Sequence, residues 1–432
     1  MAPATTRRRI LPAASHRSLA GRTPATLWML MGVLVLLSLA SGALSAWAVS
    51  QHSAAASSVA AVHEPLSLDA QQMYEAVADA DVTITGSLLA SQQPPQGQLQ
   101  RYRADIAEAA TSLADLKDAG ANPQLTAAIT AFSTGLPLYA GYVAQARDLY
   151  SVGYPLTGGS FLQVASEEAH LTLLPAAKTI YAQENAATSA ASDQATGLPT
   201  VIVALVLALA AGFALYRAQR WLAHLTHRIF NYGLVGASIV LIVSVVWLVA
   251  TFVVARSDLD TGLRQGARPA EALAQANIDV QQIRGDAILN VISRSGSTSF
   301  ETDFSTVQAE IGPLLSAAAG NAQAAPYLAA AQRDAPAWYA ANEQVYKLGA
   351  SAQYQAERDM VIGIGPGSSA AGYNQLENDI SQALAASQQT FRSGANSGAS
   401  AFGPLEGVVI AAALLVAASS AGGLSRRIAE YR

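Results

Sequence analysis

The stretch "YRAQRWLAHLTHRIFNYG" (216–233) contains three arginines and no acidic residue, and it lies between two long uncharged runs. The first run covers 198–216, and the second covers 229–255. A helix rises about 1.5 Å per residue, so about 20 apolar residues cross the hydrocarbon core of a bilayer. Both runs are therefore predicted to be membrane-spanning helices, joined by a short basic segment.

Two further apolar runs, 26–49 and 405–424, bring the predicted spans to four. The rest of the chain forms three short segments, 1–25, 217–228 and 425–432, and two long ones, 50–197 and 256–404. The short segments hold eleven basic residues against one acidic residue, whereas the long ones hold 14 basic and 28 acidic residues. Because Lys and Arg near span ends collect on the cytoplasmic side, the short segments, both termini included, are predicted to be cytoplasmic. The sequence thus predicts a multi-pass plasma-membrane protein with two long extracytoplasmic segments.

A cleaved secretory signal is the alternative for 26–49, because an arginine cluster precedes this run and "SAWA" (45–48) ends it. The run is longer than a usual signal core, and 229–255 stands in the same relation to its own long segment without being N-terminal. We therefore expect an uncleaved first span. The absence of cysteine fits extracytoplasmic segments built without disulfides.

The two long segments share the spacing of their landmarks. Pro123 recurs as Pro326 at an offset of 203, and "LPLYAGYVAQARDLY" (136–150) resembles "APAWYAANEQVYKLG" (335–349) at an offset of 199. Three Gly-, Pro- or Ser-rich interruptions occur in each segment: 91–98, 119–123 and 153–160 in the first, and 293–299, 320–326 and 363–369 in the second. Such punctuation at a nearly constant period predicts an internal duplication.

Ala, Gln, Glu, Asp and Leu dominate between the interruptions, with apolar residues at helical intervals. The predicted fold is therefore all-α, with four membrane spans and two tandem extracytoplasmic up-down four-helix bundles. In this topology the first and third interruptions of each segment lie at the membrane-distal tips. Loops at those tips are accessible, and we expect an extracytoplasmic protein to dock there through Pro94, Pro95, Tyr154, Ser297 and Pro366.

Motifs for catalysis and for cofactor binding are poor. The pair Glu167 and His170 has the Glu-x-x-His spacing of di-iron bundles, but it occurs once, and we expect it to be an ordinary helix surface. The stretch "GIGPG" (363–367) lacks the lysine of a phosphate-binding loop. We therefore expect no catalytic, cofactor or metal site, no enzyme activity and no nucleic-acid partner.

Aromatic side chains are concentrated in two places: Tyr139, Tyr142, Tyr150 and Tyr154 in the first long segment, and Trp338, Tyr339, Tyr346 and Tyr354 in the second. Bundle core is the expected role of most of them. A ligand pocket or a docking face is the alternative, and Tyr154 is the residue that best fits docking.

Arg217, Arg220, Trp221 and Arg228 of the opening stretch are the candidate cytoplasmic output surface. Arginines bind acidic groups through charge-assisted hydrogen bonds, and a tryptophan anchors such contacts. The simpler alternative is that these arginines only orient the spans, or contact the headgroups of anionic lipids in the bilayer.

A helical segment between two spans resembles the plan of bacterial chemoreceptor-type sensors, and "GGSFLQVASEEAHLTLLPAA" (158–177) resembles the start of the fourth helix in their bundles. The tandem arrangement and the small cytoplasmic surface are similar to the GlnX family of actinobacteria. That resemblance implies relay of an amino-acid signal. It would pass from an extracytoplasmic solute-binding lipoprotein of the glutamine-binding type to the soluble Ser/Thr protein kinase G.

Two functions therefore remain open at the level of the sequence. The first is a transmembrane signal transducer that carries an amino-acid or nutrient signal to a cytoplasmic kinase. The second is a structural or accessory envelope protein, a scaffold without signalling. A transporter is less consistent, because no span contains paired polar residues or a mid-span break.

Overall fold

The computed structural model describes residues 23–91, 94–118, 123–226, 232–293, 298–363 and 365–429. Within these ranges every regular element is a helix, which confirms the predicted all-α class. The chain divides into two compact units. The spanning unit comprises Met1–Ser50, Leu198–Thr251 and Pro404–Arg432, and the bundle unit comprises Gln51–Gly197 and Phe252–Gly403.

The spanning unit is built from four helices that are long and apolar enough to cross a membrane, as the sequence predicts. They are α1 (Thr23–Ser58), α7 (Pro199–Thr226), α8 (Tyr232–Gly262) and α14 (Leu405–Ala429). Much of their apolar surface faces outward, and Met29, Leu36 and Phe213 are each at least 65% exposed. Exposed apolar surface of this extent is typical of helices that face lipid or a partner protein.

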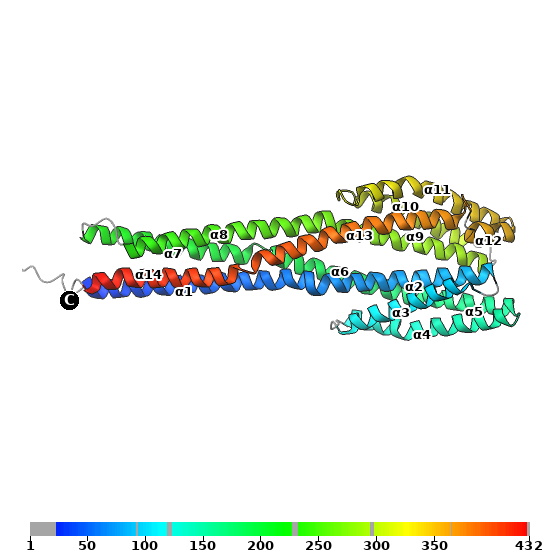
Figure 1. The fold of residues 1–432 in the computed structure, drawn as a ribbon, viewed down its shortest axis with the longest axis horizontal. Coiled ribbons are helices and arrows are strands. Elements are labelled where there is room, and N and C mark those ends of the chain that lie inside the picture. The colour runs from blue at the N-terminus through cyan, green and yellow to red at the C-terminus, as the bar shows by residue number, and fades with distance from the viewer. Residues whose placement is uncertain are drawn as a thin grey trace, which may run out of the picture. The chain divides into compact units, whose positions relative to one another are not determined.

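Small residues allow close contacts between the spanning helices. Gly42 of α1 lies against Ala413 of α14, and these two helices run side by side in Figure 1. Gly233 of α8 lies against the backbone of Gly423 on α14, so a side chain at Gly233 would not fit. Gly and Ala at helix contacts are typical of membrane bundles, where dispersion forces replace the hydrophobic effect.

The first long segment of the bundle unit follows the predicted helices. It contains η2 (Val59–His63), α2 (Glu64–Ala90), α3 (Gln96–Asp118), α4 (Pro123–Ser151), α5 (Pro155–Glu168), η3 (Ala169–Leu173) and α6 (Leu174–Thr196), where η marks a π-helical turn. The interruption expected at 153–160 is shorter than predicted, because α5 begins at Pro155. Proline is favoured at the first helical position, where no backbone N–H is required.

The second long segment has one interruption more than predicted. It contains η4 (Leu263–Ala267), α9 (Arg268–Ser293), α10 (Thr298–Ala317), α11 (Ala325–Ala350), α12 (Tyr354–Ile362) and α13 (Ser369–Phe402). The additional interruption separates α11 from α12, and there Ala352 adopts a left-handed conformation with φ 55°. The sequence expectation of three interruptions was wrong here, because no Gly or Pro stands at the left-handed position of this turn.

Helices enter and leave the bundle unit in two different ways. Helical structure continues without interruption from α1 through η2 into α2, and from α8 through η4 into α9. By contrast, Gly197 and Leu198 separate α6 from α7, and Gly403 and Pro404 separate α13 from α14. The chain passes between the two units four times, and each passage is called a crossing below. Two of the crossings have continuous helical backbone, and the other two are interrupted.

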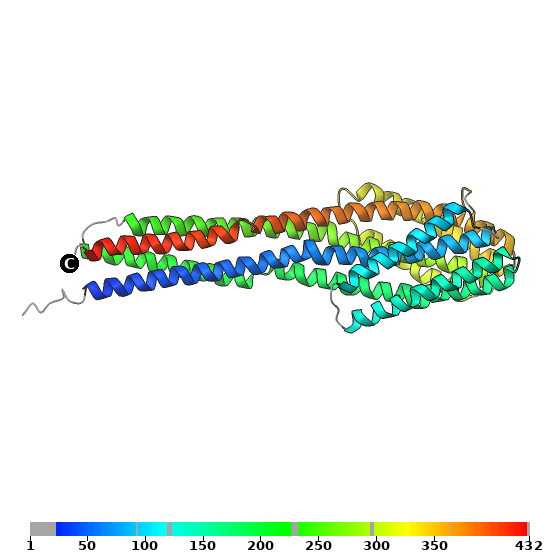
Figure 2. The same cartoon turned by 60° about the horizontal axis from the view of Figure 1, so that its bottom comes forward.

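The core of the bundle unit is shared by both long segments. One buried apolar cluster contains Met73 and Phe132 from the first segment and Trp338 and Leu376 from the second. In Figures 1 and 2, α3–α5 lie on one side of this unit and α10–α12 on the other, with α2, α6, α9 and α13 between them. The interface between α2 and α6 of the first long segment and α9 and α13 of the second is called the seam below.

Most of the aromatic residues are core, as expected. Tyr139 and Trp338 are fully buried, Tyr150 is 8% exposed and Tyr346 is 6% exposed. Tyr142 and Tyr339 are partly buried against the same cluster. Only the last residue of each group reaches solvent: Tyr154 is 63% exposed and Tyr354 is 42% exposed.

Candidate functional site

The seam carries buried polar residues at positions where α2 and α9 would otherwise present apolar side chains. They are Gln71, Asp81 and Thr85 on α2, and Asn277, Asp279 and Gln281 on α9, whereas the buried Arg284 and Asn290 of α9 contact α12 and α13. Burying a polar or charged group costs free energy unless the group finds a partner. Their concentration at one interface is the most specific chemical feature of the bundle unit.

His170 lies between carboxylates of the two long segments. Its Nε2 atom is 3.6 Å from Oδ2 of Asp81 on α2, and its Nδ1 atom is 4.0 Å from Oδ1 of Asp286 on α9. Ser166 donates a hydrogen bond of 2.6 Å to the same Asp81 oxygen. Burial opposes a charge on the imidazole, but the hydrogen bond and charge of Asp81, with the charge of Asp286, outweigh it and raise the pKa of His170.

The backbone is adapted to this histidine. His170 belongs to the π-helical turn η3, and such turns occur frequently at functional sites. Gly285 of α9 faces the ring, and a Cβ atom added there would be 2.7 Å from the Nε2 atom of His170. Only glycine at this position lets α9 approach the imidazole so closely.

A second buried contact, in the second long segment, joins Arg284 and Tyr373. Arg284 on α9 places its guanidinium 5.6 Å from the ring centre of Tyr373 on α13, and it donates a hydrogen bond to the carbonyl of Val361. Burial lowers the pKa of Arg284 to about 10, against a smaller opposing effect of Tyr373. Arg284 therefore remains charged at neutral pH, and its charge does not change in the pH range where an imidazole changes protonation.

One side of the seam is closed by direct contacts between α13 and α2. Arg392 donates to Glu64 at 2.6 Å, and Gln388 donates to Gln71 at 3.0 Å. Deeper in the seam, Asn277 of α9 donates to Glu75 of α2 at 2.8 Å. Burial raises the pKa of Glu75, although hydrogen bonds from Gln71 and Asn277 oppose that rise.

The other side of the seam, between α6 and α9, is an open groove of about 440 Å³. Its lining combines small and apolar side chains with polar ones of both charges. The apolar ones are Ala182, Ala186, Ala272 and Leu314, and the polar ones are Lys178, Tyr181, Asn185, Ser189, Arg268, Glu271 and Gln275. Among the residues that the structure describes, no ion pair joins the two helices across this groove. The two sides of the seam therefore differ in closure as well as in charge.

All four chain crossings of the bundle unit meet at His52. Its Nδ1 atom is 3.0 Å from the carbonyl oxygen of Ala195, and its ring centre lies 5.5 Å from that of Phe252 and 6.3 Å from that of Phe402. A carbonyl oxygen only accepts, so the Nδ1 atom carries the proton in this contact. His52 thus connects the crossing of α1 with the three others.

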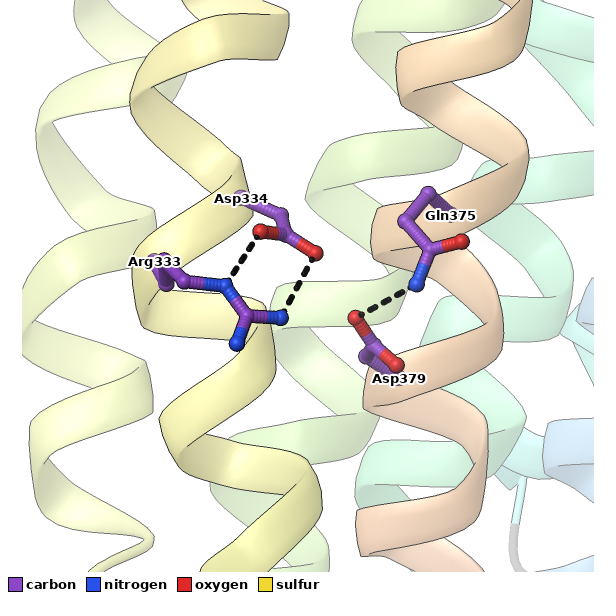
Figure 3. Close-up of polar contacts among 4 residues, drawn as sticks. All are labelled: Arg333, Asp334, Gln375 and Asp379. Atoms are coloured by element: carbon purple, nitrogen blue, oxygen red, sulfur yellow. Dashed lines mark hydrogen bonds and ion pairs between the residues drawn. The ribbon is translucent and has the colours of Figure 1, made fainter.

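Figure 3 shows polar contacts among Arg333 and Asp334 of α11 and Gln375 and Asp379 of α13, of which Asp379 is buried. The Arg333 guanidinium holds Asp334 through hydrogen bonds of 2.8 and 3.3 Å, and Gln375 donates to Asp379 at 3.3 Å. The hydrogen bond from Arg333 lowers the pKa of Asp334, so this carboxylate stays ionised. These contacts lie within one segment, and they form no enclosed site.

The residues predicted for docking are only partly placed. Pro94, Tyr154 and Pro366 follow α2, α4 and α12 in loops, and the ends of these helices lie together at one end of the bundle unit in Figure 1. Pro95 and Pro366 are exposed, Pro94 is half-buried, and Tyr154 is 63% exposed. Ser297 lies outside the described residues. The placed loops are thus accessible and near one another.

The candidate output residues face different surroundings. Arg217 and Trp221 line one groove between α1 and α7, whereas Arg220 points its guanidinium toward the Tyr216 hydroxyl at 3.4 Å. Arg228 lies outside the described residues. Of the three described residues, Arg217 and Trp221 thus share one groove and Arg220 does not line it.

Sequence reasoning assigned His170 incorrectly. The residue was expected on an ordinary helix surface, but its side chain is only 14% exposed, whereas Glu167 is exposed as expected. One signal was present: Asp81 follows Met73 and Val77 at four-residue steps, in line with the buried face of α2. Among the described residues, no group of three or more His, Cys, Asp or Glu side chains is suited to hold a metal ion.

Comparison with known proteins gives a match for part of the chain. Residues 55–193 match a family described as Actinobacterial sensor domain, and this range covers most of the helices from η2 to α6. No curated protein and no solved structure matches the chain. The protein thus combines four helices able to span a membrane with a sensor-type domain, which supports a sensing or signalling role.

Proposed function

We propose that this protein is a non-enzymatic transmembrane signal transducer with two duplicated extracytoplasmic modules. It takes an amino-acid or nutrient signal from a solute-binding lipoprotein outside the cell and passes it to a cytoplasmic Ser/Thr protein kinase of the kinase G type. The match to a sensor domain within a chain that also carries four membrane-competent helices supports this proposal.

The observation that carries the proposal is the continuity of two helices. Trp28–Ala90 and Tyr232–Ile292 are each helical throughout, from an apolar window suited to a bilayer to the polar seam. A displacement of α2 or α9 at the seam is therefore transmitted along hydrogen-bonded backbone. The returning crossings have Gly197 and Gly403 at their interruptions, where small backbone changes absorb movement.

The seam provides the two-state element that such a transducer requires. His170 contributes to contacts with both long segments, through Asp81 on one and Asp286 on the other. A partner that prefers one packing of the segments shifts the population toward that packing and moves the attached helices. Duplication supplies in one chain the four spans that two-span sensors obtain by dimerisation.

Docking of the lipoprotein is assigned to the loops at Pro94, Pro95, Tyr154 and Pro366. A photo-crosslinking amino acid at Tyr154 is expected to capture the lipoprotein in intact cells. Tyr327 is the matched control, because it is 37% exposed and lies at the opposite end of α11 from the α11–α12 turn. Equal capture from both positions contradicts the assignment.

The output is tested at Arg220, with the other arginines left to hold the topology. Cells that lack the native protein receive the wild type or Arg220→Ala, and phosphorylation of kinase substrates is measured after the amino acid is added. Loss of the response at an unchanged amount of membrane-inserted protein supports an output through this loop. If cells without the protein respond normally, the transducer proposal fails and the scaffold alternative stands.

A further inference from the structure

A groove between α1 and α7 crosses the boundary from apolar to basic residues in the spanning unit. It has a volume of about 510 Å³, and its lining is Met29, Leu30, Val33 and Leu34 from α1, and Ala214, Arg217, Ala218 and Trp221 from α7. This volume falls within the range of about 300–1,000 Å³ that is typical of small-molecule sites. The groove is called the α1/α7 groove below.

The shape of the groove follows from side-chain size. Ala214 and Ala218 lie one helical turn apart on α7, so this face of the helix is flat. Leu34 and Ala218 form the floor, because they are 2% and 1% exposed and belong to the apolar core of the unit. Met29 at 73% and Trp221 at 37% exposure form the walls. The result is an apolar channel that is open to the surroundings along the two helices.

Charge is present at one end of the channel only. Arg217 directly follows the apolar run that ends at Tyr216, so it lies at the level where hydrocarbon gives way to headgroups. Trp221, one turn further, has the amphipathic ring that prefers this level. Among the residues that the structure describes, no acidic side chain lines the groove and Arg217 forms no ion pair. An anion at this position is therefore favoured.

We propose that the α1/α7 groove binds one anionic phospholipid. Its phosphate accepts charge-assisted hydrogen bonds from Arg217, and one acyl chain lies against Val33, Leu34 and Ala214. Basic pockets between membrane helices are suited to lipid headgroups. The acyl channel selects a lipid over a free phosphate, and the single arginine selects an anionic lipid over a zwitterionic one. This inference does not depend on the proposed function, because no protein partner takes part.

Native mass spectrometry of the full chain tests the proposal. Protein released from bilayers of phosphatidylcholine and phosphatidylglycerol is expected to retain one phosphatidylglycerol. Arg217→Ala is expected to weaken retention about tenfold, since one charge-assisted contact is worth about 1.5 kcal/mol or more. Arg220→Ala is the matched control, with an expected change below about twofold, because Arg220 does not line the groove.

A second variant tests the acyl channel without touching the charge. Ala214→Leu keeps Arg217 but fills the channel, so retention of phosphatidylglycerol is expected to fall, whereas added glycerol 1-phosphate is expected to have no effect on wild type. Equal losses in Arg217→Ala and Arg220→Ala would reduce the groove to a general basic surface and overturn the proposal. Equal retention of phosphatidylcholine, displacement by glycerol 1-phosphate, or self-association that depends on Arg217 would also overturn it.

Discussion

Asp81 with His170 in the first long segment and Arg284 with Tyr373 in the second are both largely buried contacts, yet their chemistry differs. The first pair places an imidazole between two carboxylates, which raise its pKa, whereas the second places a buried guanidinium near an aromatic ring. The two sides of the seam also differ from each other. On one side α13 is hydrogen-bonded to Glu64 and Gln71 of α2, and on the other an open groove separates α6 from α9. The two long segments thus differ in that one holds an imidazole between carboxylates and the other holds a guanidinium against an aromatic ring.

Removal of the Asp81 carboxylate is the substitution with the largest expected effect on this comparison. Asp81→Ala deletes an acceptor for Ser166 and the nearer charge partner of His170. Breaking a buried ion pair from one side costs about 3–5 kcal/mol, because the remaining group is left without its partner. The free energy of unfolding is measured in detergent through the emission of Trp338, the only tryptophan of the bundle unit, with the tryptophans of the spanning unit replaced by phenylalanine.

Arg284→Met is the control for that experiment. Among the described residues Arg284 has no carboxylate within ion-pair distance, and replacement of a buried charge by an apolar side chain of similar volume is often neutral or stabilising. We expect a change of about 1 kcal/mol or less. A loss as large as that of Asp81→Ala would show that the two pairs contribute equally and would remove the contrast between them.

The pH dependence of stability is the next largest expected difference. The raised pKa of His170 means that its contribution is complete below the unfolded value of about 6.5 and is lost as pH rises through the folded pKa. The groups facing the imidazole are Asp81 on α2 and Asp286 on α9. The stability of the bundle unit should therefore fall as pH rises above about 6.5, and His170→Gln should lack this decrease.

Asp105 and Asp279 change protonation in the same pH range as His170. The quantity to measure is therefore the difference in the free energy of unfolding between wild type and His170→Gln. Burial, supported by the charge of Asp79, raises the pKa of Asp105 to about 7, and burial raises that of Asp279 to about 6. Both raised pKa values lower the stability of the folded state as pH rises from the ordinary pKa of 3.8 to the folded pKa of each group. This effect is the same in wild type and in His170→Gln, so it cancels in the difference. A difference curve that is flat between pH 6.5 and 9 contradicts the assignment of His170.

Most of the helical frame was predictable because its signals are local. Span length and loop charge identify the four membrane helices, and Pro and Gly mark most of the interruptions between helices. The turn between α11 and α12 was missed because Ala352 occupies the left-handed position there, whereas Gly153 occupies it after α4. Both turns have the same backbone hydrogen bonds at matching positions, so the geometry is set by packing rather than by residue type.

The seam was not predictable, because it depends on contacts between residues far apart in the chain. Nothing local distinguishes His170 from a surface histidine until Gly285, from the other long segment, is placed against its ring. The basic loop shows the same limit of local signals. The sequence placed Arg217, Arg220 and Trp221 in one group, but only Arg217 and Trp221 line the α1/α7 groove. The direction in which each side chain points depends on α1, which precedes the whole first long segment.

A smaller effect is expected where the seam is closed by partly exposed groups. Arg392 has a side chain that is 47% exposed, against 9% for its partner Glu64. Partial solvation weakens such a pair, so Arg392→Ala is expected to cost about 1 kcal/mol. A double-mutant cycle with Glu64→Gln isolates the interaction, and a coupling energy near zero would show that this side of the seam is held by apolar contacts alone.

The smallest expected effect lies across the seam, at Arg268 in the open groove. Arg268 is exposed, and among the described residues it forms no ion pair, so Arg268→Ala should change the free energy of unfolding by less than about 0.5 kcal/mol. Arg392→Ala is the matched comparison, because both substitutions remove one arginine from an edge of the same seam. A cost for Arg268→Ala equal to that of Arg392→Ala would mean that α6 and α9 close on each other in solution. The seam would then be bonded on both sides, and only the protonation of His170 would be left to change its packing.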